Sequence, residues 1–301
     1  MSLAAEKSLP QDYRLEAWVI FSLIGINFIW GISFVAIKIL GRYAPPITGT
    51  GLRFGIAALA LIIEAYFLKA RIFRLPERYG VLLIMGLMMA LLNVLCYTGS
   101  LFTTAGRTAL FFNTQPFFLL FLAHFFLPGD HLTLRKLSGI TIALFGVTAL
   151  FFDKLSANGT STYLGDFLVM GSAVVWACQN LLVRKLSLET GAITILFWQC
   201  AIAAIVLLPL GHFLETGRQV QFTTQFWVAI LYLSLIAAGF SFVFYTYLMQ
   251  RKSIVRLNSF VFLSPVFGVI DGWLILGEPL GVKQALGTAL IGLGIYIVNR
   301  K

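Results

Sequence analysis

Charged residues are scarce in this sequence, and so are the features that would make it soluble, fibrous or disordered. Only 11% of the 301 residues are charged, whereas a soluble globular domain carries about 25%. A soluble fold of this length would lack the charged side chains to cover its surface. Nine prolines without a repeating pattern exclude a fibrous chain, and a 59% apolar composition excludes disorder. The composition therefore indicates an integral membrane protein.

Cysteines and acidic residues are also few. Cys96, Cys178 and Cys200 all fall inside apolar segments, which is typical of buried thiols and not of a disulfide or a metal site. Twelve acidic residues against 22 basic ones give a net charge of +10. Because the basic residues lie between hydrophobic segments, we interpret them as orientation signals and contacts to membrane lipid, and we expect no nucleic-acid partner.

Long apolar segments dominate the rest of the chain. A membrane-spanning helix needs about 20 mostly apolar residues, and ten such segments follow one another with short connections. The sequence therefore predicts an all-α integral membrane protein of ten transmembrane helices, of which the fifth and tenth are short. The expected spans are Ala17–Leu40, Pro46–Leu68, Val81–Leu101, Thr108–Leu127, Leu137–Phe152, Gly165–Arg184, Ala192–Phe213, Phe226–Met249, Asn258–Gly277 and Gln284–Val298.

Lysine and arginine counts indicate the orientation of these spans. If the N-terminus is cytoplasmic, the cytoplasmic segments hold 15 basic residues and the outer segments hold six. Cytoplasmic loops are enriched in these residues, so we expect both termini in the cytoplasm. The chain then divides into a cytoplasmic segment over residues 1–16, a first five-helix unit over 17–152 and a second over 165–299.

The two five-helix units resemble each other when the chain is shifted by 146 to 149 residues. Because each unit has an odd number of spans, the two copies must lie in the membrane with opposite orientations. Inverted repeats recur in secondary transporters, where the substrate site lies near the bilayer midplane, so the repeat favours a transporter over a receptor, an enzyme or a scaffold. The matched pairs include Gly25 and Gly171, Trp30 and Trp176, Tyr97 and Tyr245, Pro116 and Pro265, and Gly139 and Gly287.

Two sequence motifs resemble a known family. The run from Asn27 to Phe34, followed by Lys38, and the run from Leu263 to Phe267, followed by 276–280, are similar to motifs of EamA-type transporters in the drug/metabolite transporter superfamily. The resemblance covers residues 17 to 299. It implies two inverted EamA repeats, a central cavity, export of amino acids or related metabolites across the bacterial inner membrane, and a monomer or a homodimer.

Uncharged polar and aromatic residues inside the spans are the candidates for a substrate cavity. An unpaired polar group is costly in hydrocarbon and usually faces the interior of the bundle. For each one the alternative is an ordinary hydrogen bond between helices, and for each tryptophan the alternative is packing. The cavity residues that we predict are Asn27, Trp30, Asn93, Tyr97, Asn113, Trp176, Asn180, Trp198, Tyr245 and Ser259.

Charged residues within the spans allow more than one interpretation. Asp271 either titrates and couples transport to protons, or it stays ionised in a water-filled vestibule or a structural pairing. Arg53 either reaches the interface or balances a substrate carboxylate. Glycines such as Gly139, Gly146 and Gly292 predict close helix contacts. We expect no catalytic residues, metal or cofactor. The alternatives are an intramembrane enzyme, a channel, or a drug or nucleotide-sugar carrier of the same superfamily.

Overall fold

A computed structural model describes residues 15–73, 79–103, 105–127, 130–152, 163–276 and 281–300. Most of the expected cytoplasmic segment over 1–16 lies outside these residues, as does most of the motif at 276–280. In the described part of the chain all the regular elements are helices. Nine of its helices are long and apolar enough to cross a membrane, and a tenth helix, α6, is shorter at 17 residues.

The helices follow the order that the sequence predicts, five spans in each half. The first half contains α1 (Ala17–Tyr43), α2 (Pro46–Phe67), α3 (Tyr79–Phe102), α4 (Ala105–Phe112) with α5 (Gln115–Phe126), and α6 (Leu134–Leu150). The second half contains α8 (Tyr163–Leu186), α9 (Ala192–Leu214), α10 (Thr224–Leu231) with η1 (Tyr232–Phe240) and α11 (Ser241–Met249), α12 (Ile254–Ser259) with η2 (Phe260–Phe262) and α13 (Leu263–Leu276), and α14 (Val282–Asn299).

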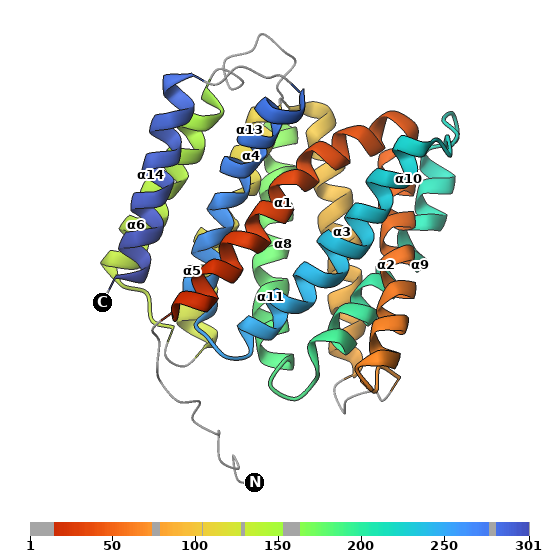
Figure 1. The fold of residues 1–301 in the computed structure, drawn as a ribbon, viewed down its shortest axis with the longest axis horizontal. Coiled ribbons are helices and arrows are strands. Elements are labelled where there is room, and N and C mark those ends of the chain that lie inside the picture. The colour runs from red at the N-terminus through yellow and green to blue at the C-terminus, as the bar shows by residue number, and fades with distance from the viewer. Residues whose placement is uncertain are drawn as a thin grey trace.

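The bundle has two ends, which we name by the chain segments found there. The terminal face is the end where α1 begins and α14 ends, and the distal face is the end that carries the α1–α2 turn (Figure 1). The α9–α10 loop also lies at the distal face, because the Gln221 amide donates a hydrogen bond to the Tyr43 carbonyl at 2.8 Å. The α6–α14 pair lies at one edge of the bundle, and α2 with α9 lies at the opposite edge (Figure 1).

The fourth span of each repeat is interrupted, where the sequence predicts continuous helices over 108–127 and 258–277. In the first repeat, Asn113 and Thr114 separate α4 from α5, and Pro116 follows at the second position of α5. In the second repeat a 3-10 turn precedes Pro265. Proline lacks the N–H that continues the helical ladder. The amide of Asn113 satisfies one carbonyl near the break, that of Ala109, at 2.8 Å.

Glycines let α6 and α14 approach each other closely, as predicted. A Cβ on Gly139 would lie 2.8 Å from the Gly294 carbonyl oxygen, and one on Gly146 would lie 2.7 Å from the carbonyl oxygen of Gly287. Only glycine fits at these positions without a backbone shift. The prediction is wrong for Gly292, which faces open space because it lies on the outward side of α14.

The two family motifs meet in space. Gly31 of α1 faces Phe267 of α13 so closely that a Cβ on Gly31 would lie 2.4 Å from the Phe267 Cβ. Asn27, one turn earlier on α1, accepts a hydrogen bond from the Ser264 hydroxyl at 2.8 Å. A first helix from one repeat therefore packs on the interrupted fourth span of the other, which joins the repeats near the middle of the bundle.

Candidate functional site

Three aromatic side chains lie between the two largest groups of buried apolar residues. One group spans α1, α5, α6 and the second-half helices around α12, and the other spans α2, α3 and α9. Trp176, Trp198 and Phe242 pack against both groups. Two of these three residues are predicted cavity residues, and the boundary between the groups is where an internal site is expected.

Trp30, at the middle of α1, lies in a closed aromatic cluster with residues of α11. Its indole N–H donates to the Ser241 hydroxyl at 2.8 Å, and its ring lies 4.9 Å from the ring of Phe242 and 5.2 Å from that of Tyr245. The side chain is only 8% exposed. Such ring distances fall in the range of favourable aromatic contacts, so α1 and α11 are held together here.

A buried polar network continues from Tyr245. The amide oxygen of Asn258 accepts hydrogen bonds from the Tyr245 hydroxyl at 3.2 Å and from the Asn180 amide at 3.5 Å. The Asn258 amide in turn donates to the Gln115 side-chain oxygen at 2.8 Å. The four residues come from α5, α8, α11 and α12, so this network joins four spans. Its one buried donor without a partner among the described residues is the Gln115 amide nitrogen.

Asn258 is the centre of this network, and the sequence analysis missed it. The prediction started the ninth span at Asn258, which made that residue appear to lie at the membrane surface. The helix instead begins at Ile254, where the Ser253 hydroxyl accepts a hydrogen bond from the Arg256 amide. Ser253 is a favourable helix cap, and that signal was present in the sequence.

Trp176 has a different environment from its repeat counterpart Trp30. Its ring stacks on Phe112 with 5.0 Å between the ring centres, and the side chain is half-buried. In the described part of the chain, its indole N–H has no hydrogen-bond acceptor. Phe112 is the last residue of α4, so Trp176 packs directly beside the interruption in the fourth span.

Trp198 and three of the polar candidates make local or interhelical bonds. Trp198 donates to the Ile72 carbonyl at 3.0 Å and so ties α9 to the α2–α3 loop. Asn27 and Asn113 donate to carbonyls one turn earlier. Ser259 accepts from the Asn299 amide of α14 at 3.0 Å. The structure therefore does not bring these four residues into one group with Trp30 and Tyr245.

Asn93 and Tyr97 lie one turn apart on α3 and are both half-buried. The Asn93 amide N–H₂ donates to the Met89 carbonyl at 2.8 Å. The Tyr97 phenol lies near the Thr50 hydroxyl and within electrostatic range of the Arg53 guanidinium, both on α2. These two predicted residues therefore lie in a second region, nearer to the distal face, together with an arginine.

Asp271 is buried in α13 and 3% exposed. One of its carboxylate oxygens has no hydrogen-bond partner among the described residues. Tyr232 is close enough to interact with it electrostatically, and the Tyr232 hydroxyl donates to the Ile29 carbonyl of α1 at 2.8 Å. The burial argues against a wide water-filled vestibule around this carboxylate.

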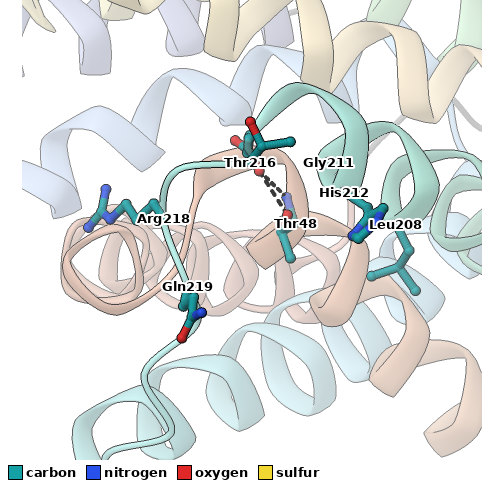
Figure 2. Close-up of a pocket in the computed structure, with 8 residues that line it drawn as sticks. Thr48, Leu208, Gly211, His212, Thr216, Arg218 and Gln219 are labelled. Carbon is teal, nitrogen blue, oxygen red and sulfur yellow. Dashed lines mark hydrogen bonds between the residues drawn. The ribbon is translucent and has the colours of Figure 1, made fainter.

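A hollow at the distal face has none of the predicted site residues in its lining (Figure 2). Both Glu215 oxygens accept hydrogen bonds at the start of α2, from the Ile47 and Thr48 amides at 2.9 and 2.8 Å. Acceptors at a helix N-terminus stabilise it, so we interpret this region as a clamp between α2 and α9. The hollow has a volume of about 430 Å³ and is lined by Thr48, Leu208, Gly211, His212, Glu215, Thr216, Arg218 and Gln219.

Metal-binding chemistry finds no support in the described residues. They contain no group of three or more histidine, cysteine, aspartate or glutamate side chains that are close enough to hold an ion. The three cysteines are free thiols. The groups that gather in the middle are aromatic rings, amides, hydroxyls and one guanidinium, which suit the recognition of a small organic molecule.

Ten helical spans in two inverted five-helix repeats, joined near the middle, define a multi-pass membrane protein of the transporter class. The EamA-like transporter family matches the chain twice, over residues 17–152 and 163–300. The chain therefore belongs to the EamA-like transporter family, of the drug/metabolite transporter superfamily. This membership points to a transporter and not to an enzyme.

Several relatives match nearly the whole chain. A probable amino-acid metabolite efflux pump of Escherichia coli (strain K12) is 29% identical and covers 89% of this chain and 90% of its own length. The uncharacterized transporter YoaV of Bacillus subtilis (strain 168) is 26% identical over 93% of this chain and 96% of its own. A crystal structure of another protein, 19% identical, shares the fold with a TM-score of 0.80, covering 94% and 96% of the two chains.

Proposed function

We propose that this transporter is a secondary carrier that exports amino acids or related small metabolites by alternating access, with aromatic and hydrophobic amino acids favoured. The observation that supports it best is the unequal packing of the matched tryptophans. Trp30 is closed in by Tyr245 and Ser241, whereas Trp176 stacks on Phe112 and its indole makes no hydrogen bond among the described residues. Unequal conformations of two inverted repeats are what a carrier with a site at the repeat interface requires.

The substrate class is supported by the residues in the middle and by the relatives. The aromatic rings of Trp30, Tyr245 and Trp176, together with the amide and hydroxyl groups in the middle of the bundle, suit a small amphipathic molecule. Two relatives at 27% and 29% identity are named as probable amino-acid metabolite efflux pumps. A nucleotide sugar carries two or more negative charges, which a region with the single guanidinium of Arg53 would not balance.

The orientation belongs to the same proposal. We place the terminal face in the cytoplasm of a bacterial inner membrane, because 15 basic residues fall on that side and six on the other. Cysteines that replace Arg71 and Arg135 should react with an impermeant maleimide only from the cytoplasmic side, and one that replaces Lys154 only from outside. Labelling of all three from one side would contradict this arrangement.

The function is tested by solute counterflow in proteoliposomes that hold the purified protein. Vesicles preloaded with an unlabelled amino acid should accumulate the labelled form, because a carrier exchanges one for the other across a closed membrane. A channel would only equilibrate the label, and an intramembrane enzyme would alter it chemically. If amino acids fail while nucleotide sugars or quaternary amines exchange, the carrier class stands and the substrate class is wrong.

A further inference from the structure

Arg53 is a charged residue deep in the bundle. It is the eighth residue of the 22-residue helix α2, so it lies within about one turn of the middle of that helix. The guanidinium lies within electrostatic range of Tyr97 of α3 and Cys200 of α9, and α2 packs against both of these helices. It is half-buried, and its Nε atom is fully covered. It therefore does not snorkel to the membrane surface.

The Arg53 charge has no partner of opposite sign in the described residues. No carboxylate forms an ion pair with it, and its buried Nε donates no hydrogen bond. Its guanidinium carbon lies over the ring of Phe54, 5.2 Å from the ring centre. An uncompensated charge inside a membrane protein is costly and usually serves a ligand or an ion pathway.

The inverted repeat provides a comparison for this position. At the offset of 146 residues that aligns the second spans, Arg53 falls on Gln199 of α9. Gln199 is 3% exposed and its amide nitrogen also lacks a hydrogen-bond partner. Each repeat therefore presents an unsatisfied donor at the same place, but only the first repeat presents a charge.

Two polar residues of α3 lie at a depth similar to that of Arg53. Asn93 and Tyr97 are one turn apart on the same face of α3, and the Tyr97 phenol interacts with Arg53. Asn93 uses its N–H₂ group on the Met89 carbonyl, which leaves its amide oxygen as an acceptor. Arg53 is seven residues from the distal end of α2 and Asn93 nine from that of α3, so the two lie at similar depth.

We propose that Arg53 binds the carboxylate of the transported molecule, with Tyr97 beside it and the Asn93 oxygen as acceptor for an amino group. One guanidinium matches one negative charge, so the substrates are monocarboxylates and not phosphate esters. This inference rests on the proposed transport function and narrows the substrates to molecules that carry one carboxylate. Trp176, which packs against the same apolar group as α2 and α3, then lies near the remainder of the substrate.

The test compares an acid with its amide. Unlabelled phenylalanine and phenylalaninamide compete with labelled phenylalanine in counterflow, and the ratio of their half-inhibitory concentrations measures recognition of the carboxylate. Wild-type protein should favour the acid by at least about tenfold, by analogy with the loss when a charged hydrogen-bonding partner is removed. Arg53→Gln should bring the ratio close to one, and Arg53→Lys should restore part of it.

Gln199→Leu is the matched control, because it removes the unsatisfied donor of the other repeat without changing charge. It should keep the acid-to-amide ratio within about twofold of wild type. Equal ratios in wild type and Arg53→Gln would overturn the proposal. A ratio that falls as far in Gln199→Leu as in Arg53→Gln would also overturn it, since the effect would then not depend on charge.

Thermal unfolding separates this inference from the transport function itself. If no amino acid exchanges, the proposed function fails, and the subsite is tested by stabilisation of the detergent-solubilised protein with a panel of monocarboxylates and their amides. Wild type should be stabilised by at least one acid and not by its amide, and Arg53→Gln by neither. Stabilisation by no acid would overturn the subsite.

Without ligand, Arg53→Gln should unfold at or above the wild-type temperature, because no structural ion pair is lost. A marked decrease in unfolding temperature would also contradict the proposal.

Discussion

Trp30 and Trp176 occupy the same position in the two repeats, yet their surroundings differ. Trp30 donates to Ser241 and packs against Tyr245, which connects to Asn258 through the buried network. Trp176 stacks on Phe112, and the repeat counterpart of Tyr245, which is Tyr97, lies beside Arg53 instead. The network that contains Tyr245 and Asn258 therefore joins the terminal half of the bundle by side-chain hydrogen bonds, and among the described residues the repeat counterparts Trp176 and Tyr97 are not joined by such a network.

Under the alternating-access function proposed above, this difference corresponds to one of the two states of the carrier. Two repeats with the same helix order can exchange conformations. The half that is now joined by hydrogen bonds then opens, and the other half closes. We infer that the structure represents a carrier closed toward the terminal face. The closing contacts are a ring cluster and a small hydrogen-bond network, each of which is weak enough to break during a transport cycle.

The largest expected effect concerns Asp271, which has no acidic counterpart because the repeat places it opposite Leu122 or Ala123. If its carboxylate carries the coupled proton, Asp271→Asn should abolish transport driven by an imposed pH gradient in proteoliposomes while counterflow at equal pH persists. The reason is that an amide accepts no proton in this pH range but preserves the size of the side chain.

Glu215→Gln is a suitable control for Asp271→Asn, because Glu215 is a half-buried carboxylate that contacts the start of α2. It should keep gradient-driven transport. Wild-type behaviour of Asp271→Asn in both assays would remove Asp271 from the mechanism. Loss of both activities with normal expression would assign it a structural role.

The second prediction breaks the closed half directly. Asn258→Leu removes three hydrogen bonds of about 0.6 kcal/mol each. The sum shifts the equilibrium away from the closed terminal half by roughly tenfold to thirtyfold. A cysteine placed at Ser241 should then react faster with a maleimide from the terminal face. Asn93→Leu, the change of an amide in the distal half, should leave that rate unchanged, and equal acceleration by both variants would contradict the comparison.

The sequence predicts the fold in most respects because two physical signals are strong. Apolar runs of the length of a bilayer identify the spans, and the odd number of spans per repeat identifies the inversion. Where the prediction is wrong, the reason is local: the ninth span begins at Ile254 because Ser253 caps it, although the charged Arg256 in its first turn lowers the hydropathy there. The prolines mark the places where the fourth spans are interrupted.

The site is less predictable from the sequence than the fold. Whether a polar side chain bonds within its own helix, as Asn113 does, or across helices, as Asn180 does, depends on the rotation of each span, which the pattern of one span does not determine. The unequal packing of Trp30 and Trp176 is beyond any reading of the repeat, because the repeat makes their positions equivalent. Only the conformation distinguishes them.

The third prediction concerns the tryptophans themselves. Trp176→Ala should weaken substrate affinity about threefold to tenfold, as expected for the loss of an aromatic contact. Trp30→Ala should show a similar loss and also a lower unfolding temperature, since it empties a buried position. Trp227 and Trp273 are about half exposed, so their alanine variants should transport normally. Equal transport by all four variants, measured as counterflow at matched protein amounts, would exclude both matched tryptophans from the site.

The smallest effect is expected at the terminal face, where Lys252 donates to Glu16 at 2.9 Å. The equivalent pair at the distal face is Asp166 with Arg107. In both pairs the acidic residue lies near the start of the first helix of one repeat, and the basic residue lies near the start of the fourth span of the other repeat. The Glu16 side chain is 53% exposed, whereas that of Asp166 is 7% exposed. Exposed ion pairs contribute little to stability and are screened by salt, so Glu16→Gln should change the counterflow rate no more than about twofold. Asp166→Asn should lower the unfolding temperature more than Glu16→Gln does.

The pH dependence of the Glu16 contribution has a definite sign. The hydrogen bond from Lys252, aided by the Trp18 indole, holds the pKa of Glu16 below its usual value. A carboxylate with a lowered pKa stabilises the folded state above its ordinary pKa, and that contribution disappears as the pH falls through the lowered value. The difference in unfolding temperature between wild type and Glu16→Gln should therefore be small at pH 7 and vanish in acid. A difference that grows on acidification would show that another group, and not the pair with Lys252, determines the effect of Glu16.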